Sequence, residues 1–408
     1  MTERLERPEG FEFEYVPTRI VYGRDCVDRL GAVLDGIGAD RAMIVCGSNV
    51  GANRDVMGPI EDGLGEKLVT VFDETTPEKY LRTVLDGVDR IEAEEIDVVV
   101  GVGGGSSLNV ARAMCSIAPL DRSRESIIEE AAETGEVPAP DESTDPLPNL
   151  AVPTTMPGAD VSAGGSVLID DEDRAPDSTG SGHVDADIVD SRLMAEANVY
   201  DPSLYATTPM SVLAPSAMNG FDKGIETLYS REATPIASAH AELGLRHYYA
   251  GLPGLTDADP DDEAYDHAVL ATILVQYGRK TNVIHTFGNG ISIHYDVQQG
   301  AVHGIVAPHV LRYVFEEVNA RRRRIAEGLG LDVTGLTDEA IADAIVEAVI
   351  RVRDGLGLPT RLRDVEGMER DHFDDVAAEI LDNYKHGRNP PGLDPTHDDV
   401  VSVLEAAW

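Results

Sequence analysis

Two polar side chains, Asn219 and Lys223, stand four residues apart in a stretch that predicts the start of a helix, Ala217 to Glu226. Residues at that spacing lie on one face of a helix, so the two side chains can hold one small ligand. An ammonium group offers donors and a positive charge but no lone pair. The pair therefore favours stabilisation of negative charge on oxygen over binding of a metal ion.

Lysine is rare in this chain, which makes the position of Lys223 informative. The sequence has 33 basic against 74 acidic residues and a formal net charge of -41. Its five lysines are Lys67, Lys79, Lys223, Lys280 and Lys385. The alternative interpretation is that Lys223 forms an ordinary surface ion pair with Asp222 or Glu226, which would stabilise the helix only slightly.

A glycine-rich turn follows the apolar run Ile96 to Val102 and precedes a predicted helix, Leu108 to Ile117. Its residues are Gly103, Gly104, Gly105 and Ser106. Without side chains the backbone can approach a pyrophosphate closely, and the free N–H groups of the helix N-terminus can bind it. The turn predicts a dinucleotide site, and the alternative is a turn that needs glycine only for steric reasons.

Composition and charge exclude several classes of protein. A hydrophobic fraction of 42% excludes wholesale disorder. Acidic residues spread along the chain, with few lysines, predict a halophilic protein adapted to a salt-rich cytosol. The same charge argues against nucleic-acid partners and against docking on anionic lipid.

The three cysteines, Cys26, Cys46 and Cys115, are odd in number and lack CxxC spacing. They predict buried thiols in a reducing compartment. The N-terminus has no apolar export core, and no apolar run reaches the length of a membrane span. We therefore expect a cytoplasmic protein without a membrane partner.

The first half of the chain alternates apolar runs with amphipathic stretches, which predicts a mostly parallel sheet covered on both faces. The predicted strands are Arg19 to Gly23 at an edge, Ala42 to Cys46, Leu68 to Phe72 and Val98 to Val102, with helices near 26–37, 54–64 and 78–92. Residues 119–148 predict a surface excursion with a short helix at Glu125 to Ala132. Residues 170–190 predict a hairpin or flap rather than core.

Beyond about Pro202 the strand patterns stop, and helical periodicity takes over. Helices are predicted at 212–229, 233–250, 262–278, 281–293, 304–328, 338–354 and 368–384. This predicts two domains, a Rossmann-like α/β nucleotide-binding domain over 1–202 and an all-α domain over 203–408.

Several segments, in order and spacing over nearly the whole chain, resemble the iron-containing alcohol dehydrogenases. They are Gly103 to Ser106, Val152-Pro-Thr-Thr155, Gly158-Ala-Asp160, Tyr200-Asp-Pro202, the run from Asn289 to His303-Gly304, and Asn389-Pro390. The resemblance implies the fold that this family shares with dehydroquinate synthase, an α/β domain followed by helices. It also implies that Thr154 and Thr155 help to hold a nicotinamide nucleotide.

Members of that family hold a divalent cation with an Asp and a His four residues apart and two further His. The matching positions here are Asn219, Lys223, Asn289 and His303, so one of the four ligands is retained. The resemblance therefore implies a branch without a metal, in which Lys223 stabilises the oxyanion. Asn219 and Asn289 would orient Lys223 or the substrate, and His303 would assist proton transfer.

The residue that matches the family's Asp after the first strand is Gly47. Loss of that carboxylate favours NADP(H) over NAD(H), with Ser48, Asn49 or Arg54 available to the 2′-phosphate. The alternative is that Gly47 only makes a tight turn. Asn109 and Arg112 stand where family members often carry Asp and Lys.

These features predict an oxidoreductase that transfers a hydride between nicotinamide and a small carbonyl or alcohol substrate bound between the domains, in a homo-oligomer. Met218-Asn219 is similar to the maleylacetate reductases, which keep His four residues later. The alternatives are a metal-dependent alcohol dehydrogenase or maleylacetate reductase-like enzyme, a lyase similar to dehydroquinate synthase, and a nucleotide-binding protein without catalysis. A displaced metal site at Asp222, His285 and His294 is a further alternative, and Gln298 and Gln299 predict a solvated loop.

Overall fold

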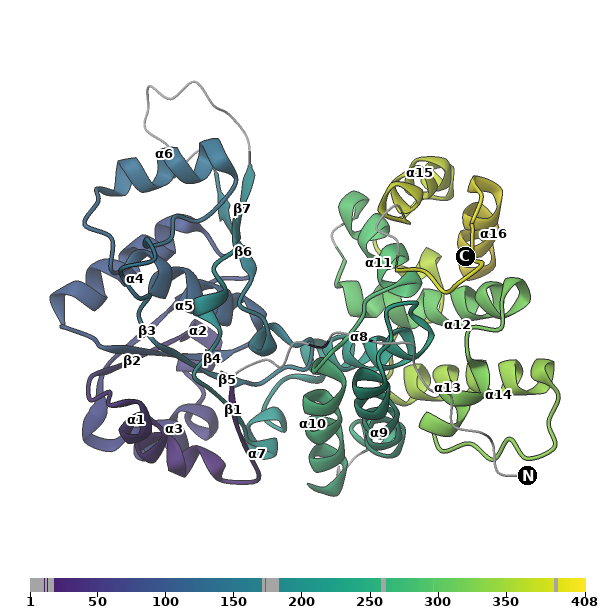
Figure 1. Cartoon of the computed structure of the whole chain (residues 1–408), viewed down its shortest axis with the longest axis horizontal. Helices are drawn as coiled ribbons and strands as arrows, with labels where there is room; N and C mark the ends of the chain where they lie inside the picture. The colour runs from purple at the N-terminus through teal and green to yellow at the C-terminus, as the bar shows by residue number, and fades with distance from the viewer. Residues whose placement is uncertain are drawn as a thin grey trace. The chain divides into compact units, whose positions relative to one another are not determined.

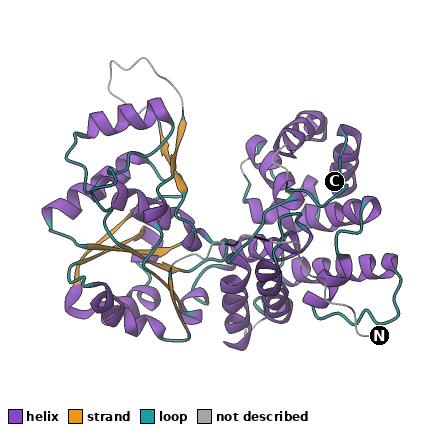
Figure 2. Ribbon diagram, in the orientation of Figure 1, coloured by secondary structure: helices purple, strands orange, loops and turns teal. Residues whose placement is uncertain are grey.

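The computed structural model describes residues 11, 13, 18–170, 173, 183–257, 262–295, 297–384 and 388–408. They form two compact units: the first lies within Val16–Thr208, and the second comprises the described residues from Pro209 onward together with residues 11 and 13. Strands belong to the first unit, and the described part of the second is built from helices (Figures 1 and 2). None of the described helices has the length and apolarity that a membrane span requires.

The first unit is organised around one parallel sheet of six strands in the order β1-β8-β5-β4-β2-β3. The strands are β1 (Arg19–Tyr22), β2 (Ala42–Gly47), β3 (Leu68–Thr75), β4 (Val98–Gly103), β5 (Asn149–Pro153) and β8 (Ala197–Tyr200). The predicted parallel sheet, with its first strand at an edge, is confirmed. The chain turns from one side of the sheet to the other between β2 and β4, and ligands of such sheets bind at the carboxyl ends of the strands that flank this point.

Alternation along each strand sends side chains into two separate cores, as the pleat requires. Ile44 and Val100 join the core under α1 (Leu30–Ile37) and α3 (Arg54–Leu64). Met43 and Val99 join the core under α4 (Leu81–Ala93), α5 (Gly105–Ile117) and α6 (Arg124–Thr134). Figure 1 shows α1 and α3 on one face of the sheet and α4 and α5 on the other.

Residues 170–190 lie partly in an antiparallel hairpin of β6 (Gly165–Ile169) and β7 (Val184–Ile188). The predicted hairpin is confirmed, and the prediction that it lies outside the core is wrong. Ala186 and Ile188 are buried against the core under α5, because alternate residues of β7 face inward. The tip, residues 171, 172 and 174–182, lies outside the described residues.

The second unit is helical, as predicted, with one helix divided and one added. Its helices are α8 (Met210–Tyr229), α9 (Pro235–Gly251), α10 (Asp262–Gln276), α11 (Val283–His294), α12 (Gln299–Glu317), α13 (Arg322–Gly328), α14 (Asp338–Gly355), α15 (Phe373–Tyr384) and α16 (His397–Ala407). The single helix predicted over 304–328 is wrong, because Ala320 and Arg321 adopt left-handed backbone angles that separate α12 from α13. Helix α16 was not predicted.

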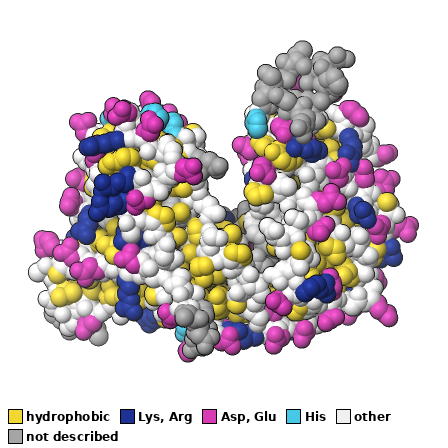
Figure 3. All heavy atoms as spheres, turned by 180° about the vertical axis from the view of Figure 1, so that it is seen from behind, with side chains coloured by type: hydrophobic (Ala, Val, Ile, Leu, Met, Phe, Trp, Pro, Cys, Tyr) yellow, Lys and Arg dark blue, Asp and Glu magenta, His cyan; other side chains and the backbone are white. Residues whose placement is uncertain are grey.

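Shorter elements complete the two units. They are the helices α2 (Ser48–Gly51) and α7 (Pro202–Tyr205) and the 3-10 turns η1 (Cys26–Arg29), η2 (Gly65–Lys67), η3 (Ala159–Val161), η4 (Ser191–Leu193), η5 (Leu252–Gly254), η6 (Leu362–Asp364) and η7 (Arg370–His372). The three cysteines are buried with free thiols, as predicted. Asp and Glu side chains are scattered over the face seen in Figure 3 and form no single block there.

Candidate active site

Helix α8 carries the residues that the sequence singled out, and from Leu213 onward nearly all of it is buried. Helix α12 packs along α8 and α11 packs on both. Asn219 and Lys223 share one side of α8, and each is 7% exposed. Lys223 is therefore not a surface lysine, and the interpretation of an ordinary surface ion pair is wrong.

A row of three carboxamides joins the three helices. The Nδ2 of Asn219 donates to the Oε1 of Gln299 at 3.2 Å. The Nε2 of Gln299 in turn donates to the Oδ1 of Asn289. The structure thus brings Asn219 and Asn289 into one network, and the link between them is Gln299, which the sequence assigned to a solvated loop.

Two glycines permit this approach of the helices. A Cβ at Gly300 would lie 1.8 Å from the backbone oxygen of Pro215, so the first turn of α12 can meet α8 only because residue 300 has no side chain. A Cβ at Gly288 would lie 2.2 Å from the Nε2 of His303. The glycines therefore set where Gln299 and His303 lie.

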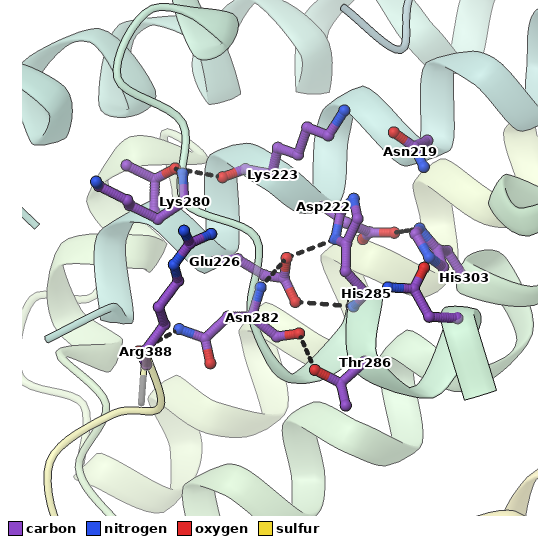
Figure 4. Close-up of polar contacts among 12 residues, drawn as sticks. Asn219, Asp222, Lys223, Glu226, Lys280, Asn282, His285, Thr286, His303 and Arg388 are labelled. Carbon is purple, nitrogen blue, oxygen red and sulfur yellow. Dashed lines mark hydrogen bonds and ion pairs between the residues drawn. The ribbon is translucent and has the colours of Figure 1, made fainter. Parts of the chain in front are cut away.

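Beneath the carboxamide row is a buried layer of two carboxyl groups and two imidazoles: Asp222, Glu226, His285 and His303. The Nδ1 of His303 lies 3.5 Å from the Oδ2 of Asp222, and the rings of His303 and His285 meet edge to face with centroids 4.3 Å apart. The Nδ1 of His285 lies 2.5 Å from the Oε2 of Glu226. Figure 4 shows this layer.

His303 has no exposed surface, and that separates it from the row above. Neither of its ring nitrogens has a hydrogen-bond partner among the described residues. The structure brings His303 together with Asp222 and His285, whereas Asn219 meets Gln299, four residues earlier on the same helix. His303 therefore lies in the buried layer in this structure and not beside Asn219.

Glu226 has a structural task as well. Its Oε1 accepts the backbone N–H of His285 at 3.1 Å, and its Oε2 accepts that of Asn282 at 2.9 Å. No side chain of α11 itself caps that N-terminus, so a carboxyl group from α8 does. Glu226 thereby fixes the end of α11 that carries His285.

Burial controls the protonation of this layer. Desolvation raises the pKa of Asp222 well above its usual range, and Glu226 adds to the effect while Lys223 opposes it. Desolvation also raises the pKa of Glu226 to about 7, and it lowers the pKa values of His285 and His303 well below their ordinary range. The layer therefore favours neutral forms, because a charge is poorly solvated there.

The donor set at the four ligand-matching positions does not fit a divalent cation. It consists of two carboxamides, one buried imidazole and the ammonium of Lys223, which has no lone pair and repels a cation. Among the described residues, no group of three or more His, Cys, Asp or Glu is arranged to hold a metal ion. His294, nine residues after His285, lies on the exposed side of α11, so those two do not converge.

The glycine-rich turn lies where the sequence predicts it, between the end of β4 and the start of α5. Gly103 has a φ of +123°, which a residue with a side chain adopts rarely. Gly104 caps α5 without a side-chain hydrogen bond, so the first N–H groups of the helix remain available. Ser106 lies in the first turn of α5 and Asn109 one turn later.

The threonine segment packs against this turn. The backbone N–H of Thr154 donates to the carbonyl of Gly103 at 3.0 Å, and a Cβ at Gly104 would lie 3.5 Å from the Oγ1 of Thr155. Thr154 and Thr155 are both buried. The predicted cofactor residues of β4, α5 and β5 therefore meet at the carboxyl end of the sheet, and the narrow glycine-lined surface fits a pyrophosphate.

Gly47 ends β2, next to β4, and Ser48 and Asn49 follow it as exposed residues of α2. The backbone of Gly47 is extended, and a Cβ there would lie 3.1 Å from the carbonyl oxygen of Thr75. A carboxylate stands on the neighbouring strand, where Asp73 lies beside Gly51. The three predicted residues thus lie at the same end of the sheet as the glycine turn.

Sequence reasoning missed Gln299, and it assigned His285 and Asp222 only to a metal alternative. One signal could have found them. Three helices each present a pair four residues apart: Asn219 with Lys223, His285 with Asn289, and Gln299 with His303. In the second and third pairs, the sequence analysis selected Asn289 and His303. The partners that it did not select, His285 and Gln299, each lie one helical turn earlier.

Curated proteins and solved structures over the whole length are similar to this chain. The NAD-dependent methanol dehydrogenase of Bacillus methanolicus is 24% identical over 379 residues, covering 90% of this chain and 94% of that protein. The maleylacetate reductase of Burkholderia cepacia is 25% identical over 407 residues, covering 97% and 96%. The structure of sulfoacetaldehyde reductase from Bifidobacterium kashiwanohense in complex with NAD+ has the same fold, with a TM-score of 0.81, 20% identity, and coverage of 98% and 99%.

Both units also match sequence models of one family. Residues 17–202 match iron-containing alcohol dehydrogenase, and residues 213–408 match the C-terminal domain of the Fe-containing alcohol dehydrogenase family. The chain therefore belongs to the iron-containing alcohol dehydrogenase family and is an oxidoreductase.

Proposed function

We propose that the protein is a metal-independent, NAD(P)-dependent oxidoreductase that transfers a hydride between nicotinamide and a small alcohol or carbonyl compound, with Lys223 in the role of the catalytic metal. One observation carries the proposal. The buried ammonium of Lys223 stands at a position that matches a metal ligand in the resemblance, in a chain that has only five lysines. A chain that has merely lost its metal site needs no cation there.

Lys223 would act on the substrate oxygen. When a carbonyl is reduced, negative charge develops on its oxygen, and a fixed cation aimed at that atom stabilises the charge. The effect is larger in a site that excludes water, and Lys223 is 7% exposed. The ammonium has three donors, so it can bind the oxygen and keep a protein partner at the same time.

The carboxamide row would fix the position of the substrate relative to the ammonium of Lys223. The hydrogen bonds run in one direction, with the carbonyls of Gln299 and Asn289 accepting from their neighbours. The row leaves the Oδ1 of Asn219 buried without a hydrogen-bond partner among the described residues. That oxygen is available to a hydroxyl of the substrate. Asn289 lies exposed at the other end, where its amide N–H groups can donate.

His303 would act through another group. Because it has no exposed surface and faces Asp222, its contribution to proton transfer would be to position Asp222 and His285. We therefore assign His303 a positioning role, which is a narrower role than contact with the substrate.

The nicotinamide nucleotide would supply the hydride acceptor or donor. Gly103, Gly104 and Gly105 would hold its pyrophosphate through backbone N–H groups, with Ser106 and Asn109 on the same helix. Thr154 and Thr155 would bound the same surface from β5. These residues bind and orient, and they take no part in the chemical step.

We propose NADP(H) over NAD(H). The support is Gly47, which leaves the end of β2 without a carboxylate to bind the ribose hydroxyls, and the exposed Ser48 and Asn49 beside it. Asp73 on β3 is the opposing observation, because its charge repels a 2′-phosphate. Two of the three relatives named above are NAD-dependent or bind NAD+ by their printed names, so a direct comparison of the two cofactors is required.

The substrate class is inferred from the small compounds on which related proteins act. Related proteins act, by their names, on methanol, 1,3-propanediol, lactaldehyde and maleylacetate. A site built from one ammonium and three carboxamides favours small polar compounds that can accept and donate several hydrogen bonds. We propose a small aldehyde, oxo acid or the corresponding alcohol.

The proposal is tested with protein that has been dialysed against a chelator and checked for metal by mass spectrometry. NADPH and NADH oxidation is followed with formaldehyde, lactaldehyde, maleylacetate and sulfoacetaldehyde, in dilute buffer and in molar KCl. The second condition is included because an acidic surface gains from screening of its self-repulsion. Turnover that chelation leaves unchanged is the expected result.

Two outcomes would overturn the proposal. Turnover that disappears on chelation and returns with added zinc or iron would make the protein a metal-dependent dehydrogenase. Tight NADPH binding without turnover of any compound, at either salt concentration, would support a nucleotide-binding protein that has lost catalysis.

A further inference from the structure

The pair formed by Glu226 and His285 has features that the roles above do not use. His285 is 5% exposed, its Nδ1 is 2.5 Å from the Oε2 of Glu226, and its Nε2 has no hydrogen-bond partner among the described residues. In Figure 4 the ring extends from α11 toward the side on which Lys223 and Asn219 lie. A buried imidazole nitrogen without a partner requires an explanation, because such atoms are normally bonded.

We propose that His285 and Glu226 form the proton-accepting pair of the reaction, with His285 contacting the substrate hydroxyl and Glu226 holding the proton. This inference rests on the function proposed above. It adds two residues to that function and replaces the idea that a single histidine, His303, serves the proton.

The orientation of His285 is fixed from three directions. Glu226 binds its Nδ1 and also its backbone N–H, so ring and helix end are tied to the same carboxyl group. The ring of His303 packs edge to face against it. Of the two ring nitrogens, Nε2 alone is left for a ligand, and the hydrogen bond at Nδ1 determines which nitrogen carries the proton.

Alcohol oxidation removes one proton and one hydride from the substrate. The O–H bond of the substrate breaks, and its proton goes to the Nε2 of His285. The proton on Nδ1 moves across the short hydrogen bond to the Oε2 of Glu226, so the imidazole ends neutral. The C–H bond breaks as the hydride leaves for the oxidised nicotinamide, and the substrate becomes the carbonyl compound. Lys223 stabilises the oxygen throughout, and reduction follows the same path in reverse.

The electrostatics of the layer agree with a proton that comes to rest on Glu226. Burial lowers the pKa of His285 well below its ordinary range, so an imidazolium is disfavoured. Burial raises the pKa of Glu226 to about 7, so this carboxyl group can take up and release a proton near neutral pH. The two shifts point the same way, toward a neutral pair once the proton has arrived.

Other groups that act on the pair come from all the neighbouring elements. Those on α8 are Asp222, Lys223 and Tyr229, and those from other elements are Arg279 before α11, His303 on α12 and Tyr384 on α15. Lys223 and Arg279 disfavour a positive charge on His285. Tyr229 donates a hydrogen bond to the Oε1 of Glu226 at 3.4 Å. The pair titrates in this environment as a unit, so its apparent value belongs to both residues.

The test uses the full-length protein and the alcohol of the panel that it oxidises fastest. For wild type, kcat is expected to rise with pH through an apparent value near 7, because the pair must be able to accept a proton. His285→Asn is expected to lower kcat by roughly 10²- to 10³-fold and to abolish the rise of kcat with pH. Glu226→Gln should shift the rise of kcat to lower pH, because an amide cannot take the proton from Nδ1. Glu226→Asp should bring the rise part of the way back.

The control is His294→Asn, a histidine on the exposed side of the same helix, which should leave the profile unchanged. If His285→Asn fails to fold, the wild-type profile between pH 5.5 and 8.5 decides alone, and a flat profile overturns the proposal. A folded His285→Asn with wild-type turnover and pH dependence also overturns it. In that case an inactive Lys223→Met would leave the proposed function standing.

A metal outcome is recognised separately. If wild type as purified contains zinc or iron and His285→Asn does not, then His285 is a ligand. That result contradicts both the proton-accepting pair and the metal-independent function. If the proposed function alone fails, turnover is lost on chelation, whereas the rise of kcat with pH still depends on His285.

Discussion

The Nδ2 of Asn219 donates to the Oε1 of Gln299 at 3.2 Å, across two helices that touch where Gly300 meets the backbone of Pro215. The hydrogen bond and the close approach are one relationship, because Gln299 precedes Gly300 and Asn219 lies one turn after Pro215. The polar row of the site is therefore positioned by a glycine that has no chemistry of its own.

Gly300→Ala is expected to destabilise the helical unit and to lower turnover. The added Cβ would lie 1.8 Å from the oxygen of Pro215, so α12 must move away from α8 and Gln299 with it. Overpacking of this kind costs roughly 1–3 kcal/mol. The check is urea unfolding together with kcat. Gly36→Ala in α1 is the control, since the added Cβ at this exposed helical glycine would meet only the end of the Arg19 side chain, at 3.5 Å, and the variant should gain stability. Wild-type behaviour of both variants would contradict this account of the interface.

The fold was largely predictable because its signals are local. Short Val-rich runs between amphipathic stretches predict a parallel sheet, and apolar residues that recur every three to four positions predict the helices of the second unit. The failures have two different causes. The break at Ala320 and Arg321 carries no glycine or proline, although both residues adopt positive φ, so only Asn319, directly before them, marks it in the sequence. The burial of Ala186, by contrast, depends on a core to which α4, α5 and α6 contribute residues far away along the chain.

The site was predictable only within a single helix. Asn219 and Lys223 share a face because their spacing requires it. Which residue of α12 meets Asn219 depends on how closely two helices approach, and the answer is Gln299 rather than His303. Burial of His303 under its neighbours is a property of packing, and periodicity does not reveal it.

Lys223→Met is expected to reduce kcat by roughly 10²- to 10³-fold, the usual effect of removing one donor to a developing oxyanion. Methionine keeps the length and apolar stem of the side chain, so nucleotide binding should be unchanged. The measurement is single-turnover oxidation of NADPH, with binding followed by cofactor fluorescence. Lys280→Met is the matched control, because Lys280 pairs with Glu232 at 3.3 Å and is part of no proposed step. Equal effects of the two substitutions on kcat would show that the loss of one positive charge matters and that the position of Lys223 does not.

Arg112→Gln is expected to raise the KM for the nucleotide more than it lowers kcat. Arg112 is buried, and burial lowers its pKa to about 10, so it remains charged at neutral pH. Its guanidinium donates to the carbonyls of Ala159 at 2.9 Å and Gly164 at 2.8 Å, which holds the loop after the threonine segment against α5. Arg90→Gln, on the surface of the same unit, is the control. An unchanged KM with lost stability would mean that Arg112 serves the fold alone.

Glu226→Gln is expected to make stability less dependent on pH. The folded-state pKa of Glu226, about 7, lies above its ordinary value, so this group contributes stability that is present at low pH and is lost as pH rises through 7. The size is about 3 kcal/mol for a fully buried group. Urea unfolding at pH 5 and pH 8, followed by Trp408 in the helical unit, should show wild type losing this amount relative to the variant. The same pH dependence in both proteins would contradict the raised pKa.

Gly47→Asp is expected to change the cofactor preference, because it returns a carboxylate to the end of β2. The backbone at Gly47 is extended, so an L-residue can adopt it, but its Cβ would lie 3.1 Å from the carbonyl of Thr75 and the strand ends must yield slightly. The new charge should accept hydrogen bonds from ribose hydroxyls and repel a 2′-phosphate. The ratio of kcat/KM for NADPH to that for NADH should fall tenfold or more, which corresponds to about 1.4 kcal/mol. Gly47→Ala is the matched control, since it adds the same Cβ without charge and should leave the ratio near that of wild type. If alanine and aspartate change the ratio equally, the strand end sets preference through shape, and the argument from the missing carboxylate fails.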